Sequence, residues 1–148
     1  MRNLAIGIGV VVVITASMFV MSLDGDGLTV SEELNHGTSP LKQDTDGDKL
    51  TDAAEVTAYR SSPTDTDTDG DDLNDKSEIQ EDSDPTRANS DADALRDYRE
   101  FSIGTDPTVA DTDGDGLLDG AEVQRYLTDP LERDSDEDGV PDYTEVTG

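Results

Sequence analysis

The sequence D-T-D-G-D-K-L-T-D-A-A-E, residues Asp44 to Glu55, decides the architecture of this chain because it recurs along its length. Frames of the same kind start at positions 22, 44, 67, 89, 111 and 134, so the steps between successive starts differ by at most one residue. A proline lies four residues before every frame except the first, and it always follows a serine or an aspartate. Six copies in register predict a repeat protein over residues 22–148.

Acidic residues occupy positions 1, 3, 5, 9 and 12 of almost every twelve-residue frame. Odd spacing in a tight turn brings successive carboxylates toward one point, and Ca²⁺ takes about 6–8 oxygen ligands in flexible geometry. Magnesium demands stricter octahedral geometry, and zinc and copper prefer His or Cys, of which the chain has one and none. The predicted calcium ligands are Asp24, Asp26 and Glu33; Asp44, Asp46, Asp48, Asp52 and Glu55; Asp67, Asp69, Asp71, Asp75 and Glu78; Asn89, Asp91, Asp93, Asp97 and Glu100; Asp111, Asp113, Asp115, Asp119 and Glu122; and Asp134, Asp136, Asp138, Asp142 and Glu145.

The charge distribution supports this interpretation. The chain has 37 acidic and 10 basic residues and a formal charge of −27, which excludes nucleic acid as a partner. Of the 37 acids, 27 lie at the five frame positions, and the other ten equal the Lys and Arg residues in number. A generally acidic or disordered surface would scatter its acids without register. Five carboxylates within twelve residues repel one another strongly without a cation.

The chain is poor in core-forming residues, since 32% of them are apolar and 4% aromatic. Apolar burial alone cannot offset the ordering entropy of such a chain. The Asp at position 9 and the Glu at position 12 also have the spacing of a helix N-cap and its N3 partner. We therefore expect short helices from position 9 to the Pro linker. Apolar residues at positions 7 and 13 predict a thin seam between neighbouring repeats, joined by Tyr59 and Tyr126.

The segment 1–23 predicts a membrane anchor or a signal segment. Leu4 to Leu23 is an uncharged run, long enough for a helix to span a bilayer core of about 30 Å. Arg2 precedes this run and Asp24 follows it, so the positive-inside rule places the repeats outside. Thr15 and Ser17 would suit a cleavage site. Both alternatives imply export, to the cell surface on one transmembrane helix or into the medium.

The string D-T-D-G-D-G-L-L-D-G-A-E-V at Asp111 to Val123, preceded by G-T-D-P at Gly104 to Pro107, resembles the thrombospondin type 3-like calcium repeats of exported prokaryotic proteins. The resemblance covers about residues 22–148. It implies an elongated, mostly irregular array of calcium loops with short helices, acting as a stalk or spacer.

EF-hand and dockerin loops are more distant relatives by pattern, because they prefer Gly at position 6, whereas here it is more often at position 4. We expect about four to six calcium ions per chain. The second, third, fifth and sixth copies should bind. Asn89, Ala92 and Ala94 should weaken the fourth copy. Ser22 and Val30 should make the first copy degenerate or a cap.

These features predict a calcium-rigidified stalk, matrix or adhesion element. A dockerin-like docking module that binds a surface protein and a calcium-bridged, self-assembling filament or layer are the alternatives. We expect no enzyme, because no nucleophile–base pair exists and no carboxylate pair sits in an apolar pocket that would separate the two pKa values.

Overall fold

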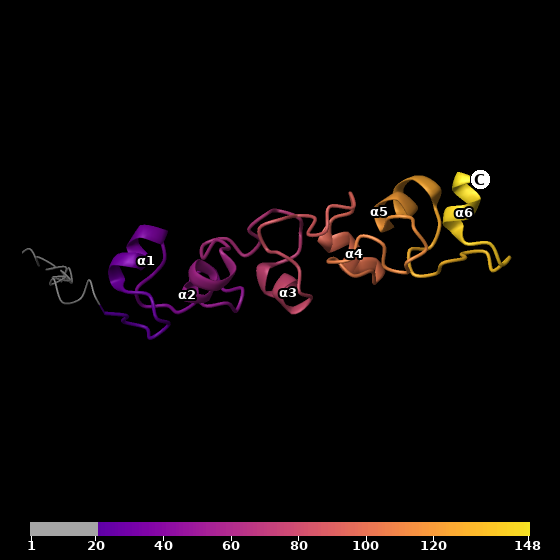
Figure 1. Ribbon diagram of the computed structural model, residues 1–148. Coiled ribbons are helices and arrows are strands. Elements are labelled where there is room, and N and C mark those ends of the chain that lie inside the picture. The colour runs from indigo at the N-terminus through magenta and orange to yellow at the C-terminus, as the bar shows by residue number, and fades with distance from the viewer. Residues whose placement is uncertain (1–20) are drawn as a thin grey trace, which may run out of the picture.

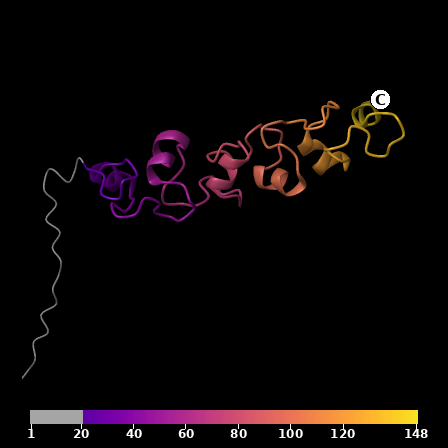
Figure 2. The same cartoon turned by 90° about the horizontal axis from the view of Figure 1, so that it is seen from below.

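A computed structural model describes residues 21–148 of the chain. The predicted N-terminal hydrophobic helix lies outside these residues. Within residues 21–148, no helix is long and apolar enough to cross a membrane. The described residues form loops and short helices without any strand, as the repeat pattern predicts. The repeats follow one another in a single row, and this elongated arrangement is visible from two directions (Figure 1, Figure 2).

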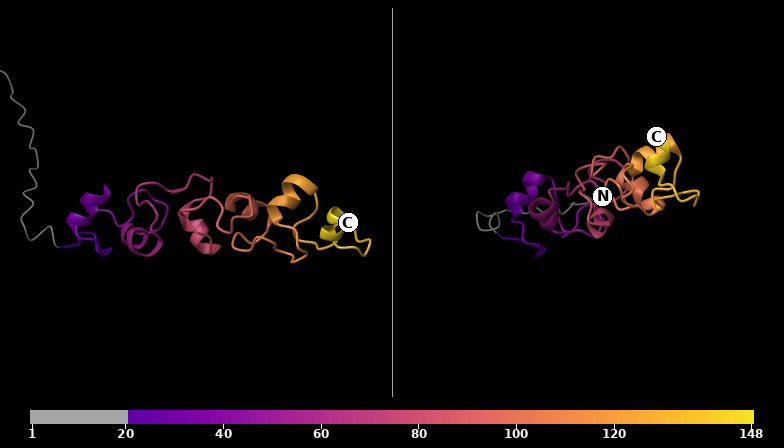
Figure 3. Two further views of the ribbon diagram at one scale, coloured as in Figure 1. Left: turned by 45° about the horizontal axis from the view of Figure 1, so that its top comes forward. Right: turned by 45° about the vertical axis from the view of Figure 1, so that its right-hand side comes forward.

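Every repeat contributes one short helical segment that starts at frame position 9, which confirms the predicted starts. The segments are α1 (Val30–His36), α2 (Asp52–Ala54) continued by the π-helix η2 (Glu55–Tyr59), α3 (Asp75–Gln80), α4 (Asp97–Ile103), α5 (Asp119–Ala121) continued by the π-helix η3 (Glu122–Tyr126), and α6 (Asp142–Thr147). The left view of Figure 3 shows these helical segments in sequence order along the row.

The predicted capping arrangement is wrong by one residue. The N-cap is position 8, as at Thr51, whose side chain accepts a hydrogen bond from the Ala54 N–H. Position 9 is therefore the first helical residue, and the Glu at position 12 is free of any capping role. The first repeat has a capping box, but it consists of Thr29 and Glu32.

The two π-helices occur in the second repeat, which runs from Asp44 to Thr66, and in the fifth, which runs from Asp111 to Arg133. We call these two the long repeats, because each has one residue more than the first, third and fourth, which we call the short repeats. In each long repeat the π-helix begins at the Glu of position 12 and ends in a left-handed residue, Arg60 or Leu127. A π-helical turn holds one more residue than an α-helical turn. The extra residue is thus absorbed after position 12, and the spacing of the acidic positions does not change.

The apolar core is narrower than the sequence predicts. Position 7 is buried in the first five repeats, by Leu28, Leu50, Leu73, Leu95 and Leu117. Position 13 does not join this core throughout, since Leu34 and Phe101 are about half exposed. Tyr59 is also exposed. Position 7 lies in the loop just before the helix and is covered there, whereas the position-13 side chains of Leu34 and Phe101 lie on the helix and stay accessible.

A network of hydrogen bonds fastens each linker to the loop that follows it. In the fifth repeat the Asp106 N–H donates to Thr112 Oγ1 at 3.1 Å. The Thr112 hydroxyl in turn donates to Asp119 Oδ2 at 2.6 Å, and its N–H donates to Asp119 Oδ1 at 2.8 Å. The same three bonds recur in the second, third, fourth and sixth repeats. The first repeat has Leu23 and Val30 at the corresponding positions 2 and 9 and lacks both partners.

Candidate metal centre

Position 1 of the frame shapes the loop. Asp44 Oδ1 accepts the Gly47 N–H at 2.6 Å, and Asp44 Oδ2 accepts the Lys49 N–H at 3.1 Å. These two donors are at positions 4 and 6, which have positive φ in all six repeats. The hydroxyl of Ser22 accepts the two equivalent N–H groups in the first repeat. Position 1 therefore supports a loop with two left-handed residues, and a serine can replace the aspartate in this role.

At positions 3 and 5, one oxygen of each carboxylate accepts a hydrogen bond from the backbone N–H two residues further along the chain. Asp69 Oδ1 accepts the Asp71 N–H at 3.1 Å, and Asp71 Oδ1 accepts the Leu73 N–H at 2.7 Å. The other oxygen of position 3 is buried without a hydrogen-bond partner in the first five repeats, at Asp24, Asp46, Asp69, Asp91 and Asp113. Such turns fix the carboxylates in place, and at position 3 they leave the second oxygen free for another ligand.

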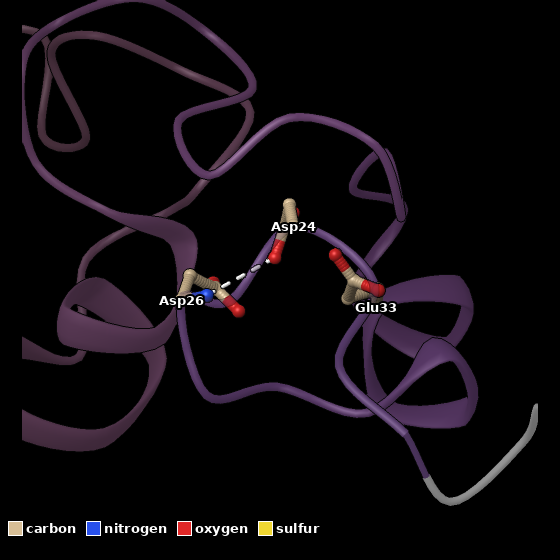
Figure 4. Close-up of side chains that lie close together, drawn as sticks. All are labelled: Asp24, Asp26 and Glu33. Atoms are coloured by element: carbon tan, nitrogen blue, oxygen red, sulfur yellow. Dashed lines mark hydrogen bonds between the residues drawn. The ribbon is translucent and has the colours of Figure 1, made fainter.

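Position 12 supplies a fully buried acid to each of the first five repeats. The side chains of Glu33, Glu55, Glu78, Glu100 and Glu122 are 0% exposed. Both carboxylate oxygens lack a partner in Glu33, Glu78 and Glu100, and one oxygen, Oε2, lacks a partner in Glu55 and Glu122. Figure 4 shows Glu33 reaching from α1 toward Asp24, whose Oδ1 accepts the Asp26 N–H.

Oxygen atoms of these acids lie close enough to share an ion. One oxygen each of Asp24, Asp26 and Glu33 lie within 4.8 Å of one another, and so do oxygens of Asp91, Asp93 and Glu100. Positions 1, 3 and 5 form such clusters in the second, third and fifth repeats. The structure thus brings together predicted ligands in the first and fourth copies as well. The first copy is not degenerate in this respect, although it lacks acids at positions 1 and 9.

Position 9 is placed differently from the other predicted ligands. Both of its carboxylate oxygens accept hydrogen bonds from position 2 of its own frame, as Asp75 does from Thr68. Its negative charge also acts on the acids of the preceding repeat: burial raises the pKa of Glu55 and Asp46 most, and the charge of Asp75 adds to the shift. Asp52, Asp97 and Asp119 act in the same way on Glu33, Glu78 and Glu100. Each of these centres therefore lies in the field of an acid from the next repeat.

Burial and neighbouring carboxylates raise the pKa of the position-12 glutamates well above its ordinary value in the first five repeats. Burial, then the charges of Asp69 and Asp71, raise the pKa of Glu78 to about 9. Similar surroundings raise the pKa of Glu100 to about 9, of Glu55 to about 8, and of Glu33 and Glu122 to about 7. Without a cation, Glu55, Glu78 and Glu100 would retain their protons at neutral pH, and Glu33 and Glu122 would titrate near it.

Position 5 also links one repeat to the next. Asp71 Oδ2 accepts the Tyr98 N–H at 2.8 Å, and Asp115 Oδ2 accepts the Tyr143 N–H at 2.7 Å. Asp26 and Asp93 make the equivalent bonds to Ala53 and Gly120. Asp48 Oδ2, at the contact between the second and third repeats, is buried without a partner. In four repeats, one acid therefore belongs both to a centre and to the first turn of the next helix.

The sixth centre is more open than the other five. Asp136 and Asp138 are exposed, and Val140 at position 7 is 38% exposed. No following repeat covers these residues in the described part of the chain. Burial of the ligands thus depends on the neighbour on the C-terminal side.

The donor set fits calcium on the evidence of its buried, unpartnered carboxylate oxygens. Burying an ionised carboxylate without a partner is strongly unfavourable, and protein structures compensate such groups by pairing or by a metal. The centres offer only oxygen ligands, several of them charged, which matches the preference of Ca²⁺. Asp at positions 3 and 5, Glu at position 12 and, in the repeats that have an acid there, position 1 would hold the ion. A bound ion would supply positive charge and no redox chemistry.

Position 2 of the frame has a structural role that the pattern of acidic residues does not predict. Position 2 is Thr or Ser in five of the six copies, at Thr45, Thr68, Ser90, Thr112 and Ser135. Its hydroxyl binds the acid at position 9 and accepts the linker N–H. In the first copy, the hydroxyl residue of position 2 and the aspartate of position 9 are both replaced, by Leu23 and Val30. This joint replacement is the sequence signal for the hydrogen bond between the two positions.

Comparison with known proteins identifies the class of repeat. The family described as "Bacterial TSP3 repeat" matches residues 23–43, 44–60, 67–88 and 111–132, which together make up more than half of the chain. The chain therefore belongs to the bacterial thrombospondin type 3 repeat family, and this confirms the resemblance inferred from the sequence. It is a calcium-binding repeat protein, of a family that is structural rather than known for enzymes.

One solved structure, titled "Biofilm associated protein - BSP domain", is similar over a short stretch at 45% identity and a TM-score of 0.29. The match covers 29% of this chain and 8% of that one, so the chain spans only a small part of that structure. No curated protein matches the chain.

Proposed function

We propose that this protein is an exported, calcium-rigidified rod that acts as a stalk or as a matrix or adhesion element at the cell surface. The observation that supports this proposal most directly is the row of centres whose buried position-12 glutamates have unpartnered oxygens. Apolar burial contributes about one leucine per repeat, so ion binding supplies much of the folding free energy. Stiffness of the rod therefore follows the calcium concentration.

The contacts between repeats explain how an ion would stiffen the row. The position-5 acid of four repeats binds an N–H of the next helix, and the position-9 acid lies next to the preceding centre. An ion that fixes the position-5 acid also fixes this helix start. It relieves the repulsion between acids of the two repeats. Calcium thus orders the contact between neighbours as well as the loop that holds it.

The uncharged segment Leu4 to Leu23 would hold the rod at the membrane or direct its secretion. Extracellular calcium modules bind with Kd values of about 10⁻⁴ to 10⁻³ M, which suits a permanently loaded structural element outside the cell. Antibody labelling of intact cells tests the location. Labelling without permeabilisation is expected, and repeats that become accessible only after lysis would contradict export.

A spin-label distance measurement tests the rod. The chain has no cysteine, so Asn35→Cys and Glu132→Cys place two labels selectively in the first and fifth repeats, on exposed residues. In the full chain we expect one narrow distance distribution in calcium and a broad one in chelator. Two labels within one repeat, at Thr57→Cys and Lys49→Cys, provide a local reference. Identical distributions between the distant labels with and without calcium would contradict the proposal.

The structure does not favour the self-assembling alternative. A second copy docked on the sixth repeat would present its first repeat, which has Val30 at position 9 where the other repeats have an aspartate. This valine offers no charge to the preceding centre and no acceptor to a position-2 hydroxyl. The first repeat therefore lacks the feature by which each repeat contributes to the centre before it.

A further inference from the structure

The linker hydroxyl that follows the helix binds the glutamate side chain in the long repeats and does not in the short repeats. In the short fourth repeat, the Thr105 hydroxyl is buried without a hydrogen-bond partner. In the short first and third repeats, the hydroxyls of Thr38 and Ser83 donate to the backbone carbonyl of the position-12 glutamate, both at 3.2 Å. In the long second and fifth repeats, the equivalent hydroxyls donate to the glutamate side chain instead. Ser61 Oγ lies 3.2 Å from Glu55 Oε1, and Thr128 Oγ1 lies 3.0 Å from Glu122 Oε1.

The π-helices explain this difference. The additional residue widens the helical turn that begins at Glu55 and at Glu122, and the backbone then leaves through Arg60 or Leu127 in a left-handed conformation. In these repeats the N–H of that left-handed residue binds the glutamate carbonyl, at 2.6 Å for Arg60 and 2.7 Å for Leu127. The linker residue one place further on therefore turns its hydroxyl to the carboxylate.

The consequence concerns the orientation of a metal ligand. Oε1 of Glu55 and Glu122 has a hydrogen-bond donor, and Oε2 is the buried oxygen without a partner. In Glu33, Glu78 and Glu100 both oxygens lack a partner, so no side chain fixes their rotation. Groups that bind a metal ligand from behind orient it, and their removal typically lowers metal affinity about 10- to 100-fold.

We propose that the extra residue of the second and fifth repeats makes Ser61 and Thr128 positioning residues for the ion ligands Glu55 and Glu122. The hydroxyl holds Oε1 and leaves the buried Oε2 as the oxygen that is free to bind the ion. These two centres are thereby preorganised in a way that the centres of the short repeats are not. The inference rests on calcium binding by the repeats and adds a division of the centres into two kinds.

Removal of the hydroxyls tests the proposal in the full chain, stripped with chelator and kept in a mild detergent. Calcium is added, and the loop amide signals of Leu50, Leu73 and Leu117 report on the second, third and fifth centres by NMR, with Leu28 for the first. Ser61→Ala should lower calcium affinity about tenfold at the second centre, and Thr128→Val should do so at the fifth. The matched controls Thr38→Val and Ser83→Ala, whose hydroxyls bind a backbone carbonyl, should leave the affinity of their own centres essentially unchanged.

Two further variants separate positioning from a merely structural role. Ser61→Thr and Thr128→Ser keep the hydroxyl, and both variants should bind calcium with the affinity of the unmodified chain. Deletion of Leu127 shortens the fifth repeat to the length of the short repeats, and Thr128→Val should then have no effect on its centre. Unchanged affinity in Ser61→Ala and Thr128→Val, or equal losses in the controls, would overturn the inference while calcium binding itself stands. Absence of calcium binding at every centre of the unmodified chain would instead contradict the proposed function.

Discussion

At the residue scale, each acid of the frame has a distinct role that its position determines. Position 1 holds two left-handed backbone groups, positions 3 and 5 close short turns, and position 9 fastens the linker. In the first five repeats, position 12 is buried without a partner for at least one oxygen. The spacing of the acids indicates a metal and identifies the centre. It does not separate ligands from acids that bind hydrogen-bond donors, because the same carboxylate can do either.

The fourth repeat contains two alanines in a conformation that favours glycine. Ala92 has φ of 70° and Ala94 has φ of 83°, whereas most repeats have glycine at one or both of these positions. An L-residue in the left-handed region costs about 1 kcal/mol relative to glycine. Ala92→Gly and Ala94→Gly should each raise the unfolding free energy of the calcium-loaded protein by about 0.5–1 kcal/mol, measured by denaturant titration.

The control for these two variants is Ala121→Gly. Ala121 lies in α5 with φ of −73°, so glycine there should lower the unfolding free energy by about 1 kcal/mol. If all three variants destabilised the protein equally, the left-handed geometry of positions 4 and 6 would be wrong.

The glutamates at position 12 predict an inverted pH dependence for the calcium-free protein. Burial first, then nearby aspartates, raises the pKa of Glu78 and Glu100 to about 9, from an ordinary value of 4.5. The folded state then binds protons more tightly than the unfolded state. The resulting stability is fully present below pH about 4.5 and is lost progressively as the pH rises from there to about 9.

We therefore expect the melting temperature in chelator to fall between pH about 5 and about 9, followed by circular dichroism. Glu78→Gln and Glu100→Gln together should flatten this decline, because the amides do not titrate. In saturating calcium the decline should disappear, since the ion replaces the protons. A melting temperature in chelator that increases over this range would show that these two glutamates are not buried beside other carboxylates.

At the scale of the element, the helices owe their position to the contact with the preceding loop rather than to their length. Segments of six to eight residues are too short to be stable alone. The start of each helix follows from the sequence, because position 9 and the Pro linker delimit it. The π-helices are not evident from propensity. They follow only once the extra residue of the long repeats is combined with the requirement that the acids stay in register.

Gly120 illustrates how closely a helix start approaches the preceding loop. A Cβ at this residue would lie 2.5 Å from the carbonyl oxygen of Asp93 and 3.0 Å from the Leu95 nitrogen, both backbone atoms. Gly120→Ala should therefore displace α5, weaken the bond from the Gly120 N–H to Asp93, and destabilise the protein by about 1–3 kcal/mol. The fourth centre should lose calcium affinity as well, since Asp93 belongs to it.

The matched control for Gly120→Ala is Ala53→Gly, at the same frame position in the second repeat. This change adds no atoms and should cost at most about 1 kcal/mol from helix propensity. Denaturant unfolding and the calcium-dependent amide signal of Leu95 measure both effects. An unaffected fourth centre in Gly120→Ala would contradict the described contact between loop and helix.

At the scale of the whole molecule, the chain is a one-dimensional array in which each repeat contacts its neighbours. Stability in such arrays is approximately a sum of repeat and nearest-neighbour terms. The repeat architecture, its boundaries and the acidic clusters follow from the sequence because they depend on spacing alone. The exposure of Leu34 and Phe101 could not be predicted from the sequence, because it depends on how far the helix extends beyond the neighbouring loop. The role of the position-9 acids between repeats likewise emerges only from the three-dimensional contacts.

The central claim is that buried carboxylate clusters bind calcium and order the array. Its most direct test is a calorimetric titration of the chelator-stripped full chain with calcium. We predict saturable binding at several sites per chain and release of protons at pH about 7, because the glutamates lose the protons that they retain without an ion. Sites should be lost when position-12 glutamates are replaced, as in Glu78→Gln with Glu100→Gln. No saturable binding up to about 10 mM calcium, above the range for extracellular modules, would contradict the account.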